Sequence, residues 1–358
     1  MMINKTITRL PNSSLNSTLL HPCSVYIIQP GSSRIFGTSS VQANRGISPW
    51  FITGFTDAEA CFRISIIKNK NYKSTQALGP SEKVKGNLTS LPLSARLYFQ
   101  IELHRKDEAI LESIKSALGV GKIYRTRPDT SMLQVSSFKD IPAVIDFFDK
   151  YPLVTQKLAD YLLFKQAYEI IKNKEHLTLD GLSKLVGVKA SLNNGLPAQL
   201  KEAYPDVEPV KRLNVVNKEI PDPNWLVGFV SGEGCFSVGV HPSTHHKLGY
   251  QARLRFQITQ QNRDQELMES IVGYLNCGII SFRKDVVDYH VHKFSQITEN
   301  IIPFFTKYPI KGVKKENFDD FCKVAKLIKE KAHLTEAGLE QINKIKDGMN
   351  SHREGASA

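Results

Sequence analysis

Apolar residues occupy every second position in two short stretches of the chain, residues 96–101 and 253–258. Because successive side chains of a strand point to opposite faces, this alternation predicts two strands that are buried on one face only. Polar or amphipathic residues fill the intervening positions, so the other face is open to a partner. The side chains expected on these open faces, together with one from an earlier strand-like run, are Arg63, Arg96, Gln100, Arg253, Arg255 and Gln257.

Apolar residues then recur at helical spacing soon after both stretches, over residues 110–118 and 267–275. A stripe of this period predicts an amphipathic helix with one face in the core. Asp107 and Asp264 stand just before these stripes. Aspartate is a preferred N-cap residue, so each is predicted to cap the helix that follows it.

A different short stretch occurs twice, at residues 52–60 and 226–234. Ser or Asp followed by Pro precedes each copy, at residues 48–49 and 222–223, and such a pair is preorganised to begin a helix. Matching blocks continue through both halves, with an insertion in the first half between its first two predicted strands. The repeat indicates one unit made twice and packed with pseudo-twofold symmetry.

Small residues stand four apart inside each repeated helix, Gly54 with Ala58 and Gly228 with Gly232. Residues at this spacing share one face of a helix. Side chains this small let another helix backbone approach closely. We therefore expect the two repeated helices to pack against each other through these four positions.

Each repeated helix is expected to end on a glutamate, Glu59 in the first copy and Glu233 in the second. The C-terminal end of a helix carries partial negative charge, so an acid there is unfavourable by roughly 0.3–1 kcal/mol. An acid at two equivalent unfavourable positions suggests that a metal ion binds there.

These glycines and acids, Gly54 with Glu59 and Gly228 with Glu233, resemble the paired motifs of the LAGLIDADG homing endonucleases. The resemblance is to the single-chain form with two motifs, of the fungal mitochondrial intron-encoded kind, and it extends over almost all of residues 48–350. One such motif alone is a weak signal. Two copies with equivalent helix starts, inside a repeat of this length, are a specific one.

Two positions depart from the motif of that family. Ala60 stands where the motif usually ends in glycine, and Ser231 stands where the first copy has Asp57. Neither departure changes the two acids.

The resemblance implies an α/β (α+β) fold of two pseudo-twofold-related αββαββα units. Each unit has an antiparallel, saddle-shaped sheet, and the units pack through the two motif helices. The expected boundaries are a leader over 1–47, a first unit over 48–204, a linker over 205–221, a second unit over 222–350 and a tail over 351–358.

The resemblance also implies that Glu59 and Glu233 are catalytic acids that bind a divalent cation, with the backbone carbonyls of Ala58 and Gly232 as further ligands. Oxygen ligands of this kind suit Mg²⁺. Such a site performs metal-assisted attack of water on a phosphodiester bond.

Two catalytic lysines and one glutamine are implied as well. The lysines, one beside each scissile phosphate, fall on Lys157 and Lys314. Gln260 matches a glutamine found near the metal in relatives, whereas its counterpart in the first half is Leu103.

The charge of the chain favours a polyanionic partner. There are 47 Lys and Arg against 35 Asp and Glu among 358 residues, a formal net charge of +12. Arginine reads guanine and glutamine reads adenine in the major groove, so the open strand faces are predicted to bind double-stranded DNA. The insertion of the first half is either a tolerated surface loop or a set of phosphate contacts. Its lysines are Lys68, Lys70, Lys73, Lys83 and Lys85.

Residues 1–47 contain no Asp or Glu and are rich in Ser, Thr and Asn. Such a segment is typical of a mitochondrial transit peptide, and equally of a leader translated from an upstream exon. Both alternatives point to an organelle, the mitochondrion. The five cysteines are scattered and odd in number, which argues against a disulfide framework.

We therefore expect a monomeric, Mg²⁺-dependent, site-specific endonuclease that makes a staggered double-strand cut in DNA and promotes intron or gene mobility. One alternative on the same fold is an RNA-splicing maturase that does not cleave. Another is a nucleic-acid-binding regulator without chemistry. The presence of both Glu59 and Glu233 favours the endonuclease, since neither alternative needs an acid at two helix ends.

Overall fold

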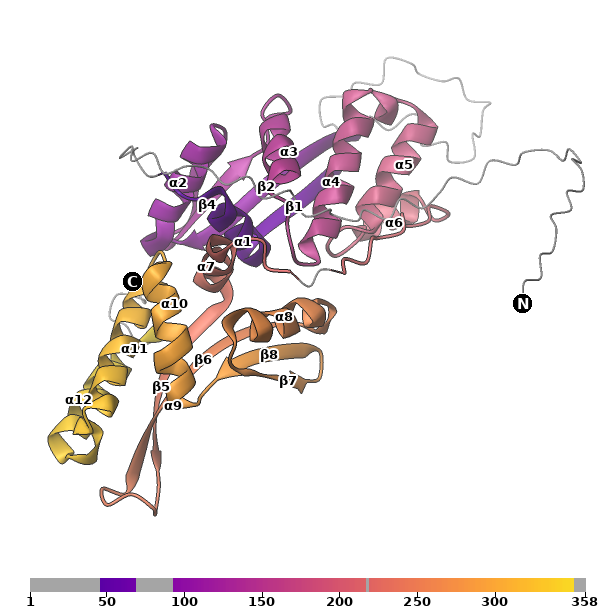
Figure 1. Cartoon of the computed structure of the whole chain (residues 1–358). Coiled ribbons are helices and arrows are strands. Elements are labelled where there is room, and N and C mark those ends of the chain that lie inside the picture. The colour runs from indigo at the N-terminus through magenta and orange to yellow at the C-terminus, as the bar shows by residue number, and fades with distance from the viewer. Residues whose placement is uncertain (1–45, 69–92, 217–218, 351–358) are drawn as a thin grey trace, which may run out of the picture. The chain divides into compact units, whose positions relative to one another are not determined.

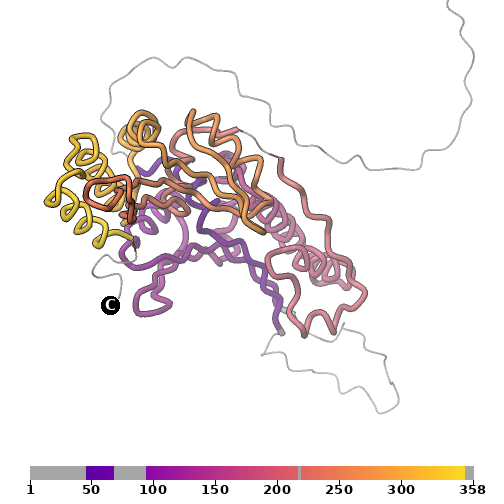
Figure 2. Tube along the Cα trace, turned by 90° about the horizontal axis from the view of Figure 1, so that it is seen from below, coloured from indigo at the N-terminus to yellow at the C-terminus, as the bar shows by residue number. Residues whose placement is uncertain are grey.

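The computed structural model describes residues 46–68, 93–216 and 219–350, and it consists of two similar sets of helices and strands (Figure 1). Each set runs helix, two strands, helix, two strands and then helices, as predicted from the sequence. The trace in Figure 2 can be followed from the first set, indigo to magenta, to the second set, orange to yellow.

The first set follows the predicted order from its motif helix onward. Its elements are α1 (Pro49–Glu59), β1 (Ala60–Lys68), β2 (Leu93–His104), η2 (Arg105–Asp107), α2 (Glu108–Leu118), β3 (Lys122–Arg127), β4 (Thr130–Val135), α3 (Ile141–Lys150), α4 (Lys157–Lys172), η3 (Glu175–Leu177), α5 (Leu179–Ala190) and α6 (Ala198–Ala203).

The second set repeats this order as far as α12, which matches α5 of the first set, and adds a short π-helical turn, η5. Its elements are α7 (Pro223–Glu233), β5 (Gly234–Pro242), β6 (Tyr250–Gln261), η4 (Asn262–Asp264), α8 (Gln265–Leu275), β7 (Ile279–Arg283), β8 (Val286–Val291), α9 (Phe294–Gln296), η5 (Ile297–Ile301), α10 (Ile302–Lys307), α11 (Lys314–Lys329), η6 (Ala332–Leu334) and α12 (Glu336–Asp347).

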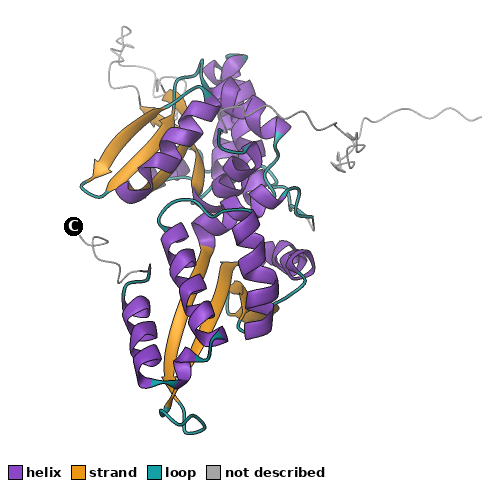
Figure 3. Ribbon diagram, turned by 60° about the vertical axis from the view of Figure 1, so that its left-hand side comes forward, coloured by secondary structure: helices purple, strands orange, loops and turns teal. Residues whose placement is uncertain are grey.

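Each set contains one four-stranded antiparallel sheet, with strand orders β1-β2-β4-β3 and β5-β6-β8-β7. Helices cover one face of each sheet, as the purple helices and orange strands of Figure 3 show. The apolar positions of the predicted alternation lie on that covered face, where Phe99 and Phe256 are both fully buried. The predicted fold class is therefore confirmed.

The motif helices α1 and α7 lie side by side and join the two sets (Figure 1). A Cβ atom built on Gly54 would lie 1.9 Å from the carbonyl oxygen of Trp225, and one built on Gly228 would lie 2.1 Å from that of Phe51. Only glycine fits at these two positions, because the opposing backbone occupies the space of a side chain.

One detail of the predicted helix starts is wrong. Asp107 and Asp264 occupy the N-cap positions of α2 and α8, but neither side chain bonds to its own helix. Each bonds instead to an amide of the other set, Asp107 to Val313 and Asp264 to Gln156.

The predicted starts of the motif helices are confirmed: Ser48 and Asp222 are the N-cap residues of α1 and α7, and proline follows each. The Asp222 side chain accepts from the amide of Asn224, whereas the Ser48 side chain makes no cap bond.

Part of the predicted DNA contacts lies outside the described residues. Lys68 ends β1, whereas the other lysines of the insertion, Lys70, Lys73, Lys83 and Lys85, fall in the part of the chain that the structure does not describe. Within the described ranges, none of the helices combines the length and apolar character needed to cross a membrane.

Candidate active site

The C-terminal ends of α1 and α7 bring the two motif glutamates together. Helix α1 ends at Glu59 and continues directly into β1, and α7 ends at Glu233 and continues into β5. Glu59 lies against the opposite helix: a Cβ atom built on Gly232 would be 3.1 Å from its carboxylate oxygen Oε1 and 2.4 Å from the Cβ of Ala58. The small residues therefore let the two acid-bearing helix ends meet.

The electrostatic surroundings of Glu59 disfavour its negative charge. Burial raises the pKa of Glu59 above its ordinary value, and the nearby negative charge of Glu233 raises it further, by a smaller amount. The positive charges of Lys314 and Lys157 oppose this shift. Two carboxylates so close are stabilised by cations between or beside them.

The ammonium group of each predicted lysine contacts the end of the motif helix of its own set. The Lys157 ammonium donates hydrogen bonds to the carbonyl oxygens of Thr56 at 3.0 Å and of Ala58 at 3.2 Å. The Lys314 ammonium likewise donates to the carbonyl of Gly232. The Thr56 carbonyl also accepts from the amide of Ala60, whereas the carbonyls of Ala58 and Gly232 lie at the very end of their helices, beyond the last i→i+4 hydrogen bond. Burial lowers the pKa of both lysines, and the neighbouring acids oppose that shift.

The oxygen atoms at the helix ends form a donor set suited to a hard cation. It comprises the carboxylates of Glu59 and Glu233 and the carbonyls of Ala58 and Gly232, which already accept hydrogen bonds from ammonium groups. Within the described ranges, no three side chains of His, Cys, Asp or Glu gather at one place, so the carboxylates here number two. Two carboxylates supplemented by carbonyl and water oxygens match the preference of Mg²⁺.

The predicted glutamine lies near the same helix end. In the antiparallel register, Gly234 of β5 pairs with Ile258 of β6, and Gln260 follows two residues later, paired with Val287 of β8. Gln260 thus extends along β6 past the start of β5, where α7 ends. In the first set, Ala60 pairs with Ile101 in the same way, and Leu103 takes the equivalent position.

A buried aspartate that sequence reasoning gave no role fixes the start of helix α4. Asp57 is 4% exposed. It accepts hydrogen bonds from the amides of Val154 at 2.9 Å and Thr155 at 3.2 Å, and from the Thr155 hydroxyl at 2.6 Å. Burial raises the pKa of Asp57, and these bonds oppose that shift. Lys157 follows two residues later, so Asp57 helps to hold it in position.

Asp57 also joins the two sets, because its Oδ2 atom accepts a hydrogen bond from the indole Nε1 of Trp225 at 2.8 Å. The repeat aligns Asp57 with Ser231 and Trp225 with Phe51, so the pseudo-symmetric pair cannot form this bond. At both positions the two halves of the sequence differ, and this difference was the signal from which the contact could have been suspected.

The uncovered faces of the sheets carry the arginines and glutamines that the alternation predicted. Arg63, Arg96, Arg253 and Arg255 are exposed, and Gln100 and Gln257 are half-buried. On β1, the Arg63 guanidinium lies 4.5 Å from the ring centroid of Tyr98, its partner in register on β2. This stacking restrains one arginine, whereas a solvated arginine would sample many rotamers.

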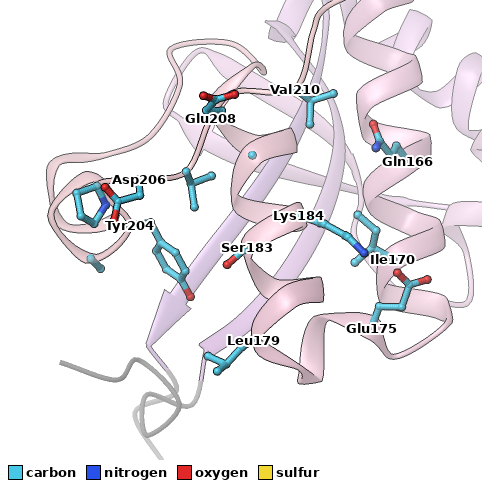
Figure 4. Close-up of a pocket in the computed structure, with 14 residues that line it drawn as sticks. Gln166, Ile170, Glu175, Leu179, Ser183, Lys184, Tyr204, Asp206, Glu208 and Val210 are labelled. Carbon is cyan, nitrogen blue, oxygen red and sulfur yellow. The ribbon is translucent and has the colours of Figure 1, made fainter. Parts of the chain in front are cut away.

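A pocket elsewhere in the first set does not share this chemistry. It lies between α4, α5 and the segment after α6, with Glu175, Lys184, Tyr204, Asp206 and Glu208 in its lining (Figure 4). None of its lining residues belongs to the motif helices or to the sheets. Three carboxylates and one lysine that pairs with Asp180 make it unsuited to a phosphate backbone.

Curated relatives of the chain are fungal proteins named as endonucleases. "Probable intron-encoded endonuclease 3" of Neurospora crassa is 38% identical over 85% of this chain and 55% of its own length. "Probable intron-encoded endonuclease 2" of the same fungus is 35% identical over 87% of this chain and 67% of its own length. The chain therefore spans about half to two thirds of the length of these relatives.

Solved structures resemble the chain over nearly their whole length. I-SmaMI bound to an uncleaved DNA target in the presence of calcium ions is 41% identical, with a TM-score of 0.77 over 85% of this chain and 99% of that one. I-CpaMI bound to uncleaved DNA is 43% identical, with a TM-score of 0.77 over the same shares.

A family model described as LAGLIDADG endonuclease matches residues 52–168 and 226–325, more than half of the chain. Both matched regions begin inside the motif helices that carry Glu59 and Glu233. The chain therefore belongs to the LAGLIDADG endonuclease family, in its single-chain form with two motifs.

Proposed function

We propose that the chain is a site-specific endonuclease that hydrolyses both strands of a double-stranded DNA target. The observation that carries this proposal is the meeting of Glu59 and Glu233 at the ends of two paired helices, each of which leads directly into a sheet with an open polar face. A double-strand cut needs hydrolysis of one phosphodiester bond in each DNA strand, and the two equivalent acids would provide one for each strand. I-SmaMI, which is similar in fold, has been solved with uncleaved and with cleaved DNA.

We propose Mg²⁺ as the cofactor. The carboxylates of Glu59 and Glu233 and the carbonyls of Ala58 and Gly232 would hold it, since all four offer hard oxygen atoms. When bound, the cation would neutralise charge on the scissile phosphate and make water a better nucleophile. The presence of calcium ions with I-SmaMI and its DNA supports a divalent cation.

The two lysines are proposed to act beside the scissile phosphates. Lys157 and Lys314 begin α4 and α11, and both ammonium groups are held at the ends of the motif helices. A cation in this position attracts the phosphate and stabilises charge that develops on it. Gln260, at the end of β6, is proposed to contribute in the second set only.

The open strand faces are proposed to read the target. Their exposed arginines suit guanine, and their glutamines suit adenine, in a major groove wide enough for strands. The residues proposed to contact DNA are Arg63, Lys68, Lys70, Arg96, Gln100, Arg253, Arg255 and Gln257. Because one chain supplies both motifs, a monomer would suffice for a staggered double-strand cut.

The setting proposed for this activity is the mobility of an intron or gene in the mitochondrion. The names of the relatives as intron-encoded endonucleases support the role in mobility. The acid-free composition of residues 1–47 supports the organelle.

Selection of cleaved duplexes from a randomised library in the presence of Mg²⁺ tests the proposed function. We expect a defined long target from the parent protein. Glu59→Gln and Glu233→Gln each keep shape but remove the charge that binds the cation, so we expect double-strand cleavage to fall roughly a hundredfold or more. Affinity for the selected target should stay near that of the parent.

Glu112→Gln is the matched control, because Glu112 is an exposed acid on α2 paired with Lys115. We expect it to cut as the parent does. Undiminished cutting by both E59Q and E233Q would contradict the proposed site. Binding of structured intron RNA without any cleavage of duplex DNA would favour a maturase instead.

A further inference from the structure

A buried aspartate lies on the open face of the second sheet. Asp288 of β8 is 1% exposed, although its neighbours Val287 and Tyr289 point to the covered face and belong to the core. In register, Asp288 pairs with Thr259 of β6 and with Ser281 of β7. It therefore lies at the centre of the face that carries Gln257.

Three side chains of this face cover Asp288 and bond to it. Arg283 makes two bonds, from Nε to Oδ2 at 2.5 Å and from a terminal nitrogen to Oδ1 at 2.9 Å. The Thr259 hydroxyl donates to Oδ1 at 2.5 Å, and Nε2 of Gln257 donates to Oδ1 at 2.8 Å. Nε2 of Gln257 also donates to the Thr259 hydroxyl at 2.9 Å.

Asp288 is ionised at neutral pH, because its bonds with Arg283 lower its pKa to about 2 despite its burial. An ionised carboxylate only accepts hydrogen bonds. The amide of Gln257 must therefore turn its NH₂ group toward Asp288 and Thr259, so that its Oε1 atom points away from them. Among the described residues, none donates to Oε1 of Gln257, which is the remaining polar atom of the side chain.

The first set lacks this arrangement. Nε2 of Gln100 donates to Oε1 of Gln134 at 2.6 Å, and both partners are amides that can reverse together. The position of Asp288 is taken there by Met132, which pairs with Glu102 as Asp288 pairs with Thr259 and has no carboxylate to accept from an amide. A fixed amide is thus a property of the second sheet.

We propose that Asp288 is a specificity-determining residue that fixes Gln257 as a hydrogen-bond acceptor toward the major groove. This proposal rests on the proposed function. A free glutamine can turn either its oxygen or its NH₂ group toward a base, whereas Asp288 holds the NH₂ group of Gln257 and leaves its oxygen to meet the base. The acceptor selects a base with an exocyclic amino group, adenine or cytosine. It disfavours guanine and thymine, which present carbonyl oxygens.

The test is selection of bound duplexes from a randomised library in a buffer with chelator, followed by sequencing of the retained DNA. At one base position, the parent should prefer adenine or cytosine over guanine or thymine by about two- to tenfold, the effect of one hydrogen bond. Gln257→Ala should remove this preference and leave other positions unchanged. Asp288→Asn should also flatten it, because the freed amide can rotate.

Asp285→Asn is the matched control. Asp285 is an exposed acid in the turn between β7 and β8, so its loss changes the charge equally without touching the Gln257 amide. It should bind more DNA overall and keep the preference. Gln257 is half-buried, so Q257A carries the test even where D288N does not fold.

Three results would overturn the proposal. One is a parent preference for guanine or thymine at the position that Q257A changes. Another is a D288N protein with the preference of the parent. The third is a Q257A protein that alters no position while the parent still selects a defined target. A parent that retains no duplex at all would instead overturn the proposed function, and this proposal with it.

Discussion

Asp107 in the first set accepts a hydrogen bond from the backbone amide of Val313 in the second set, at 2.7 Å. The repeat duplicates this contact, because Asp264 accepts from the amide of Gln156 at 2.7 Å. Val313 and Gln156 are the N-cap residues of α11 and α4. Each set thus supplies a negative charge at the positive end of the other set's lysine-bearing helix, which favours both helices.

Asp107→Ala should lower the free energy of unfolding by about 0.5–2 kcal/mol, the usual cost of losing a capping side chain. Denaturation in urea measures this change. Asp140→Ala is the control, because Asp140 occupies the N-cap position of α3 without a side-chain cap bond. Equal losses in the two variants would show that the contact between the sets contributes nothing.

Gly54→Ala should destabilise the protein by roughly 1–3 kcal/mol or more, because the new Cβ would overlap the carbonyl of Trp225. Gly273→Ala serves as control, since Gly273 lies in α8 and a Cβ atom added there would have nothing within 4 Å. Alanine there should instead stabilise by about 0.4–1 kcal/mol. Thermal melts of the two variants should shift in opposite directions, and a shift in the same direction would contradict the close packing of α1 and α7.

Lys157→Met should slow cleavage of the selected target by on the order of a hundredfold, because one scissile phosphate loses its neighbouring cation. Nicked product from cutting of a single strand should accumulate. Lys172→Met removes the same charge from the other end of α4, where Lys172 pairs with Glu169 on the surface. We expect it to cut both strands as the parent does, and accumulation of nicked DNA in this variant too would argue for a general charge effect.

The stability that ionised Asp288 contributes should depend on pH in a defined window. Its pKa is lowered from the ordinary 3.8 to about 2. Because the pKa is lower in the folded protein, Asp288 contributes its full stability at a pH above its pKa in the unfolded chain. That stability is lost as the pH falls through the folded pKa of about 2. The parent should therefore exceed Asp288→Asn in melting temperature by a constant amount above pH 5, and the difference should shrink toward pH 3. A difference that grows on acidification would contradict the ion pair with Arg283.

Local pattern was sufficient for the elements and for most of the candidate site. Apolar residues alternate with polar ones over residues 96–101 and 253–258 because one face of each strand is buried. This period of two can be read from the sequence without a structure. Glu59 and Glu233 could be found because the motif occurs twice, and a repeat reveals equivalent positions without any structure.

Contacts between the two sets could not be predicted in this way. Asp107 was expected to cap its own helix, and only the packing of the sets brings it to Val313 instead. Likewise, Asp57 meets Trp225 across the pair of motif helices. N-cap preference is a local rule, whereas the partner of a polar side chain is decided by whichever donor the tertiary structure brings within reach.

The sequence by itself determined the two-unit fold, the paired acids and the alternating polar strand faces, because each follows from a short period or from the repeat. Only the tertiary structure decided the orientation of the Gln257 amide, since that depends on Asp288 and Arg283 from two further strands. Such a hydrogen-bond network has no period along the chain. It forms when side chains that are distant in sequence meet on one face of a folded sheet.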